Sequence, residues 1–142
     1  MDIRISFPGG KRVDAHFGGR VVHTDQSPEH GGEGSEAEPF ELFLASLATC
    51  AGVYVLGFCQ ARSIPTDGIE LSQHHEFDPE THRLTKVGIQ ISVPPSFPAK
   101  YVPALERVAA KCTVKRVIQE APEFVIEARA RGEQSQPVSV AP

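Results

Sequence analysis

The amino-acid sequence predicts an α+β fold in which a mostly antiparallel sheet wraps around one long central helix. Residues 42–59 form an eighteen-residue run, LFLASLATCAGVYVLGFC, that contains no charge and has a cysteine at its centre. Alternating patterns typical of strands lie on both sides of this run. Strands and helices do not alternate one for one, which favours α+β over a parallel α/β architecture. A chain of 142 residues is long enough for a single domain with a sizeable core.

The N-terminal part predicts two or three short strands followed by a loop. Residues 4–24 are interrupted by turn signals at Pro8-Gly9-Gly10 and Gly18-Gly19. Residues 25–38, DQSPEHGGEGSEAE, are polar, acidic and glycine-rich without periodicity. We therefore expect a mobile loop here, and its place just before the apolar run suggests a lid.

The apolar run itself predicts a helix from Pro39 to about Ala61, ahead of Pro65. Proline is favoured in the first turn of a helix because its missing N–H would have no partner there. Glu41 follows in the first turn, where a carboxylate interacts favourably with the helix dipole.

Eighteen uncharged residues are also the lower limit for crossing a bilayer, so the run has a membrane alternative. Its alanine, glycine and serine content makes it only modestly hydrophobic, charged residues lie close to both ends, and the chain has no tryptophan. The N-terminal MDIRISFPGGKRVDAHF lacks the apolar core of a signal peptide. We expect a buried helix in a cytoplasmic protein. Because such a helix needs cover on every side, a second copy of the chain is the expected source, which predicts a homodimer.

The segment after the helix predicts a β-hairpin. Residues 69–77 alternate, and a second strand begins near Arg83 and continues to Val93. Between them, Asp78-Pro79-Glu80-Thr81 has proline at the favoured second place of a turn.

The C-terminal part predicts a helical region and one more strand. Residues 104–120 carry apolar side chains at helical spacing, with a possible break near Cys112. Residues 123–130 alternate like a strand, and residues 131–142 are typical of a flexible tail. We therefore expect one domain over residues 1–130.

Composition excludes several classes of function. A net charge of −4 and a pI near 5.8 give no basic footprint for nucleic acid or anionic lipid. An odd number of cysteines argues against a disulfide-stapled extracellular fold. The six histidines offer no set of three ligands with metal spacing, so no metal or other cofactor is expected.

The three cysteines differ in their surroundings. Cys50 and Cys59 are nine residues apart on one helix, so they point to opposite sides and stand roughly 13 Å apart along the axis. They cannot form a disulfide with each other, and Cys112 is the only possible partner for either. Cys59 follows bulky apolar residues and is expected to fill the core. Small residues leave room around Cys50.

Cys112 has the cationic neighbours Lys111, Lys115 and Arg116. Cations favour the reactive thiolate form of a cysteine. The alternative is that these three side chains form a solvated helix face with no effect on the sulfur, and local sequence leaves both interpretations open.

The two cysteine contexts together carry a family resemblance. The stretch PFELFLASLATCAG, followed some sixty residues later by KCTVKRVI, resembles the osmotically-inducible-protein-C / organic-hydroperoxide-resistance (OsmC/Ohr) family. The resemblance extends from about Gly18 to Ala130. It implies an intertwined OsmC-like homodimer with sites at the subunit interface, and thiol-dependent reduction of organic hydroperoxides without metal or haem. By position, Cys50 is then the peroxidatic thiol and Cys112 the resolving thiol, with an external dithiol as reductant.

The resemblance also implies an activating arginine, steadied by a glutamate that precedes the cysteine helix. Arg20 is the best positional match for the arginine. The family glutamate directly follows the proline, where this chain has Phe40, and Glu41 comes one residue later. Nine residues before Cys50, Glu41 lies on the far side of a straight helix. The chain is in this respect closer to a less characterised branch of the family.

The shifted glutamate favours a second hypothesis from another class. The protein would then be a dimeric binding module, with Cys50 lining an apolar interface pocket for a small hydrophobic or electrophilic molecule. A ligand retained through purification would indicate a binding module, whereas fast peroxide reduction supported by a dithiol would indicate an enzyme.

Overall fold

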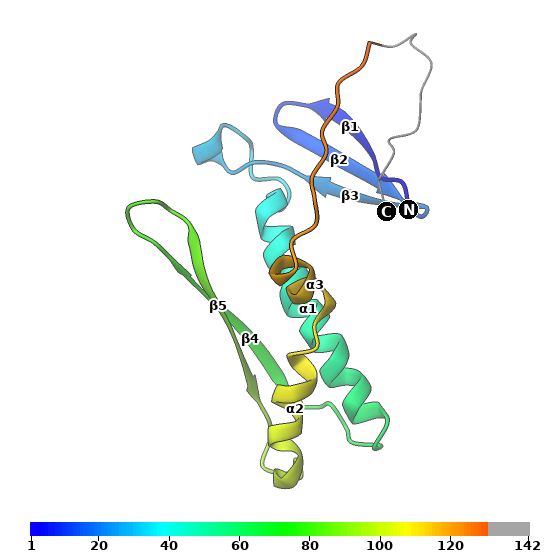
Figure 1. Ribbon diagram of the computed structural model, residues 1–142, viewed down its shortest axis with the longest axis vertical. Helices are drawn as coiled ribbons and strands as arrows, with labels where there is room; N and C mark the ends of the chain where they lie inside the picture. Colours follow the sequence, from blue (N-terminus) through cyan, green and yellow to red (C-terminus); the bar gives the residue numbers. More distant parts are fainter. Residues whose placement is uncertain (131–142) are drawn as a thin grey trace.

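The computed structural model describes residues 1–130, and the chain is α+β with antiparallel sheets, as the sequence predicts (Figure 1). The order of elements is β1 Arg4–Gly9, β2 Arg12–Phe17, β3 Arg20–Thr24, η1 Pro28–His30, α1 Pro39–Gln60, β4 Glu70–Phe77, β5 Leu84–Ser92, η2 Ala99–Tyr101, α2 Val102–Ala109 and α3 Thr113–Gln119. The strands form two separate sheets, β1-β2-β3 and β4-β5. Within one chain they therefore do not make the single sheet around the helix that the sequence suggested.

The N-terminal sheet is a meander whose turns depend on glycine. Gly18 and Gly19 connect β2 to β3 with φ angles of 54° and 72°. A two-residue hairpin loop with both φ angles positive matches the right-handed twist of the flanking strands, and glycine adopts it without steric cost. The predicted strands and their turn signals are confirmed.

Helix α1 begins at Pro39 and ends at Gln60, as expected from the sequence. Its start is held by a capping box, in which the backbone N–H of Glu38 donates to Glu41 Oε2 at 2.9 Å and the Glu38 side chain accepts from the backbone of Glu41. This reciprocal pair satisfies two N–H groups that a helix start otherwise leaves without partners.

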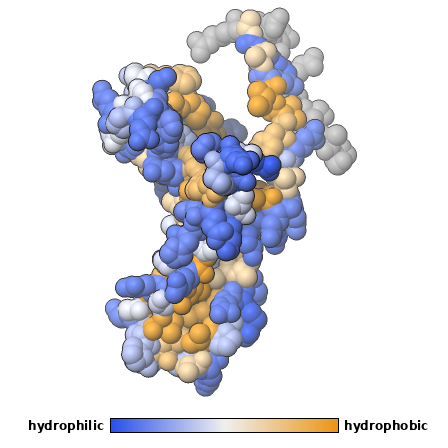
Figure 2. Space-filling model, turned by 90° about the vertical axis from the view of Figure 1, so that its left-hand side faces the viewer, coloured by the Kyte–Doolittle hydropathy of each residue, from blue (hydrophilic) through white to orange (hydrophobic). Residues whose placement is uncertain are grey.

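One face of α1 is covered and the other is not. Leu47, Ala51 and Val55 are buried, whereas Val53 is 64% exposed on the opposite side. The expectation of a helix enclosed all round is therefore not met by a single chain. The core lies toward the C-terminal half of α1, where Val55, Phe58 and Cys59 pack with Phe97 and Leu105. Figure 2 shows apolar surface in this lower half of the molecule, framed by hydrophilic residues.

The acidic loop before α1 is organised by hydrogen bonds around one carboxylate, and its expected mobility stays a prediction. Asp25 is buried, and its carboxylate accepts bonds from the backbone N–H groups of Gln26, Glu33 and Ser35 and from the Ser35 hydroxyl, at 2.8 to 3.2 Å. These bonds lower the pKa of Asp25 to about 2, the Ser35 backbone N–H contributing most. Polar residues without periodicity can thus encode a specific loop when one carboxylate gathers several donors.

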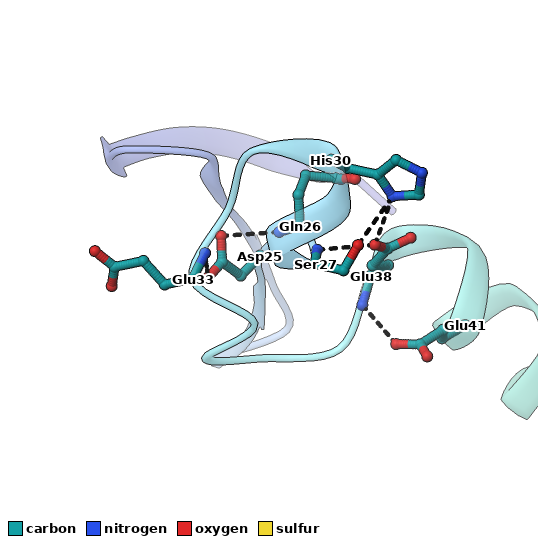
Figure 3. Close-up of polar contacts among 7 residues, drawn as sticks. All are labelled: Asp25, Gln26, Ser27, His30, Glu33, Glu38 and Glu41. Atoms are coloured by element: carbon teal, nitrogen blue, oxygen red, sulfur yellow. Dashed lines mark hydrogen bonds and ion pairs between the residues drawn. The ribbon is translucent and has the colours of Figure 1, made fainter.

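A second contact joins this loop to the helix start (Figure 3). His30 Nδ1 lies 2.9 Å from Glu38 Oε1, and the Ser27 backbone N–H donates to the same oxygen at 2.8 Å. The bond to His30 is the main cause that lowers the pKa of Glu38 to about 2. We call Ser27, His30 and Glu38 the loop clasp.

The hairpin and the break between the C-terminal helices agree with the sequence. Strands β4 and β5 pair along their length, and the Asp78 carboxylate accepts from the backbone N–H groups of Glu80 and Thr81 in the turn. Helix α2 ends at Ala109 and α3 begins at Thr113, with Cys112 as the N-cap of α3.

The strand predicted for residues 123–130 is wrong for the single chain. This segment has no regular structure, with Phe124 81% and Ile126 94% exposed. In Figure 2 the segment that leads into the grey atoms carries apolar residues in open view. An alternating pattern indicates that a strand would have one apolar and one polar face, but it does not indicate which strand it would pair with. This segment pairs with no strand among residues 1–130. The predicted tail, 131–142, lies outside the described residues.

Candidate functional site

The structure brings Cys50 and Cys112 together from opposite halves of the chain. Cys50 lies near the middle of α1, partly exposed, and Cys112 is buried at the start of α3. The Cys112 thiol donates to the carbonyl oxygen of Leu47, 3.8 Å away and one turn before Cys50. The two thiols lie close enough that each shifts the pKa of the other. Because α2 ends shortly before Cys112, the chain can turn here and place the second sulfur against α1.

The surroundings of Cys50 stabilise its thiolate. The backbone N–H of Val114 makes the largest contribution to lowering the pKa of Cys50, and the Cys112 thiol and the Thr113 N–H act in the same direction against desolvation. The two backbone N–H groups are donors that favour the charged form of the sulfur. A lowered pKa is typical of cysteines that act as nucleophiles.

Cys112 has the opposite tendency. Burial raises the pKa of Cys112, and the neighbouring Cys50 raises it further, against the backbone N–H of Lys115, which donates to Cys112 Sγ at 3.4 Å. The pair thus consists of one sulfur favoured as thiolate and one favoured as thiol. This asymmetry is suited to a nucleophile and a second thiol that resolves the product of its oxidation.

The cations around Cys112 do not lower the pKa of either sulfur through their charges. Lys111 and Arg116 are exposed, and Lys115 acts on Cys112 through its backbone N–H. This arrangement agrees with the solvated-face alternative. The feature of this segment that matters for the cysteine pair is therefore the start of a helix at Cys112, and not the positive charges of the neighbouring side chains.

Cys59 is fully buried and lies in the core with Phe58 and Leu105. Burial raises the pKa of Cys59, which keeps it in the thiol form. It fills the core, as the sequence analysis expected.

Arg20 and Glu41 do not contribute to the pKa of Cys50 in the single chain. Arg20 opens β3 and, with Arg4 and His16, lines an open hollow of about 490 Å³ on the N-terminal sheet. Glu41 is occupied in the capping box of α1. The roles that the family resemblance implies for these two residues stay predictions.

An apolar groove of about 500 Å³ lies beside the cysteine pair. We call it the α3 groove, and it is lined by Phe43, Thr113, Val114, Val117, Ile118, Ala121, Pro122 and Phe124. Phe43 lies two turns before Cys50 on the same side of α1, and Val114 supplies an N–H to the Cys50 sulfur. The groove therefore shares Thr113 and Val114 with the surroundings of the Cys50 sulfur.

Sequence reasoning missed this groove and the N–H groups of Thr113 and Val114. The spacing of Val114, Val117 and Ile118 indicated an apolar helix face, but not which element would leave it open. No group of three or more histidine, cysteine, aspartate or glutamate side chains within residues 1–130 is arranged to hold a metal ion.

One helix of the described chain, α1, is long and apolar enough to cross a membrane by length and composition alone. The core helices of soluble proteins pass the same test. In this structure α2, α3 and β4 pack against α1.

Comparison with solved structures shows the fold. The chain is 21% identical, with a TM-score of 0.68, to a Psychrobacter arcticus 273-4 protein named for the osmotic stress and detoxification response, over 80% of this chain and 85% of that one. An OsmC-like protein from Mycoplasma pneumoniae is 14% identical with a TM-score of 0.66, over 84% and 87% of the two chains. A Legionella pneumophila protein named organic hydroperoxide resistance protein OsmC is 19% identical with a TM-score of 0.54, over 84% and 90%.

At these identities the likeness shows a shared fold and nothing more about activity. No curated protein matches the sequence. The sequence profile of OsmC-like proteins, however, matches residues 32–127, which is more than half of the chain and includes both Cys50 and Cys112. The chain belongs to the OsmC-like protein family.

Proposed function

We propose that the protein is a thiol-dependent peroxidase that reduces organic hydroperoxides, with Cys50 as the peroxidatic and Cys112 as the resolving cysteine. The observation that carries this proposal is the contact between two thiols whose pKa values are shifted in opposite directions. The two cysteines lie on different elements, α1 and the start of α3, and each shifts the pKa of the other, so a disulfide between them would join two neighbouring thiols.

The proposed reaction has three balanced steps. The Cys50 thiolate attacks the terminal oxygen of ROOH, the O–O bond breaks, and Cys50 becomes a sulfenic acid as RO⁻ leaves and takes a proton to give ROH. The Cys112 sulfur then attacks the Cys50 sulfur, which forms the disulfide and releases water. An external dithiol returns both cysteines to thiols and is itself oxidised to a disulfide.

The α3 groove supports an organic substrate over hydrogen peroxide. Its lining is almost entirely apolar, and it reaches the N–H groups that face Cys50. The R group of a hydroperoxide would lie against Phe43 and Val117, with the peroxide oxygen toward the sulfur. Burial of apolar surface favours such a substrate by about 25 cal/mol per Å².

We further propose that the working form is a cytoplasmic homodimer. The outer face of α1 exposes Val53 and Leu56, and the segment after α3 exposes Phe124 and Ile126. A second copy would bury both surfaces and offer strand edges to the alternating segment. Arg20 or Glu41 could then approach the partner's cysteine, which would give them the roles that the family resemblance implies. A monomeric mass in solution at micromolar concentration would contradict this part of the proposal.

The activity is tested by following consumption of cumene hydroperoxide and hydrogen peroxide with dithiothreitol as reductant. We expect dithiol-dependent turnover that prefers the organic peroxide, lost in Cys50→Ser and kept in Cys59→Ala. In Phe43→Ala the KM for cumene hydroperoxide should rise with little change for hydrogen peroxide. Consumption by wild type that is no faster than by Cys50→Ser would overturn the proposal.

The α3 groove also favours a second candidate, a binding module for a small hydrophobic or electrophilic molecule. Native mass spectrometry of freshly purified protein separates the two. A retained ligand that is lost in Phe43→Ala, together with negligible dithiol-dependent turnover, would favour the binding module. Turnover with no retained ligand would favour the peroxidase.

A further inference from the structure

The start of α3 is tied to α1 by a hydrogen bond between two hydroxyl groups. Tyr54 Oη and Thr113 Oγ1 lie 3.0 Å apart, at an exposed position on the surface of the single chain. Tyr54 comes four residues after Cys50, so it stands one turn further along the same face of α1. Thr113 directly follows Cys112. The bond therefore joins the two elements beside the cysteine pair without involving either sulfur.

Contacts on both sides of the pair fix where α3 begins. On one side the Cys112 thiol contacts the carbonyl oxygen of Leu47 at 3.8 Å, and on the other the Thr113 hydroxyl contacts Tyr54. At the far end of this seven-residue helix, Val117 is 48% and Ile118 46% exposed. The polar contacts at its start join α3 to α1 beside the cysteine pair.

We propose that the hydroxyl of Tyr54 is a positioning group that holds Thr113, and with it Cys112 and the first N–H groups of α3, against Cys50. The inference rests on the proposed function only for its consequence in turnover. Its direct consequence is for the Cys50 sulfur, because the N–H groups of Thr113 and Val114 could move away from it when the hydroxyl is removed. Tyr54 touches neither substrate nor sulfur in this role, so it is not a catalytic residue.

The inference is tested by the pH profile of Cys50 alkylation with iodoacetamide, with peptide mass spectrometry that resolves Cys50 from Cys59. Tyr54→Phe removes only the hydroxyl and should lower the alkylation rate of Cys50 at neutral pH by about 2- to 10-fold, the range of one net hydrogen bond, and move the profile to higher pH. Thr113→Val should do the same, and Thr113→Ser, which restores the hydroxyl, should recover the wild-type profile. The double variant Tyr54→Phe/Thr113→Val should be no slower than either single one.

Tyr101→Phe is the matched control. Tyr101 is the other of the two tyrosines in the sequence, and its ring packs against Phe58 at the far end of α1. It should leave the profile unchanged. The inference is overturned if Tyr54→Phe keeps the wild-type profile, or if Tyr101→Phe shifts it equally. Because alkylation needs no peroxide, the alkylation result does not depend on whether the protein is a peroxidase. A wild type that consumes no peroxide but loses Cys50 reactivity in Tyr54→Phe would refute the peroxidase and keep the positioning role.

Discussion

Cys50 and Cys59 lie two and a half turns apart on one helix, yet their sulfurs are in opposite chemical environments. Cys50 faces N–H groups of α3 and the Cys112 thiol, which lower its pKa. Cys59 lies in the core, where burial raises its pKa against the smaller opposing effect of the Arg62 charge. An apolar helix does not by itself make a cysteine reactive or inert. What matters is which element packs over each turn and whether that element presents N–H donors or hydrocarbon.

The largest expected difference between the two cysteines is in peroxide turnover, and it is tested by removing the proposed partner of Cys50. In Cys112→Ser the Cys50 sulfenic acid has no resolving thiol, so we expect it to accumulate after peroxide treatment and steady-state turnover to fall by at least about 100-fold, as the loss of a catalytic group commonly causes. Trapping with dimedone followed by mass spectrometry measures the sulfenic acid. In Cys59→Ala neither change should occur. Equal loss of turnover in both variants would remove the distinction between the two sulfurs.

Alkylation of the unmodified protein sharpens the comparison. Each unit by which the pKa falls raises the thiolate fraction about tenfold at a pH below it. The Cys50 profile should therefore have its midpoint below 9.0, the ordinary value for a cysteine, and that of Cys59 above it. We expect Cys50 to react faster than Cys59 at neutral pH by more than tenfold, helped by its exposure. Similar rates at the two positions in the folded protein would contradict the assignment.

For the free energy of unfolding, the order of the two positions should be reversed, with substitution of Cys59 costing more than substitution of Cys50. Cys59→Ala leaves a small cavity in the core and should lower the free energy of unfolding by about 1 kcal/mol, a common value for a buried site. Cys50→Ala, at a partly exposed position, should cost less. Urea unfolding followed by circular dichroism measures both. A larger loss for Cys50→Ala would show that its contacts hold the fold rather than tune the sulfur.

The smallest expected effect concerns the loop clasp at the other end of α1. The folded pKa of Glu38 is about 2 against an ordinary 4.5, so its contribution to stability is fully present above pH 4.5 and is lost as pH falls toward 2. The pKa of His30 is raised, chiefly by Glu38, so its contribution is complete below 6.5 and is lost as pH rises through the folded value. The clasp should be strongest between pH 4.5 and 6.5.

Thermal unfolding across pH 2 to 7 measures this effect. Glu38→Gln should lower Tm by a few degrees in that window and flatten its pH dependence, whereas Glu36→Gln in the same loop should not. The effect is small because exposed ion pairs contribute little. An unchanged pH dependence in Glu38→Gln would show that the clasp does not hold the loop.

Much of the fold could be predicted from local signals in the sequence. Pro39 and the uncharged run gave the bounds of α1, glycine pairs gave the turns, and Asp78-Pro79 gave the hairpin. Non-local features could not be predicted in this way. The alternating segment at 123–130 lacks a strand partner within one chain, and the polar loop is ordered by the single buried carboxylate of Asp25.

The site shows the same division. The positions of Cys50 and Cys112 were singled out from their local sequence and from the family resemblance. The groups that tune Cys50 are backbone N–H groups, which every residue type carries, so no pattern of side chains could have marked Thr113 and Val114. The sequence places Tyr54 four residues after Cys50, which is about one turn of the helix. Its hydrogen-bond partner, Thr113, could only be found from the structure, where α3 packs against α1.

The most direct test of the central claim is peptide mapping after one equivalent of cumene hydroperoxide is added to the fully reduced protein. We expect a single new disulfide between Cys50 and Cys112, with Cys59 still free to be alkylated after unfolding. A protein in which Cys50 is oxidised without joining Cys112, or in which all three cysteines stay reduced, would contradict the proposal that this pair forms the reactive centre.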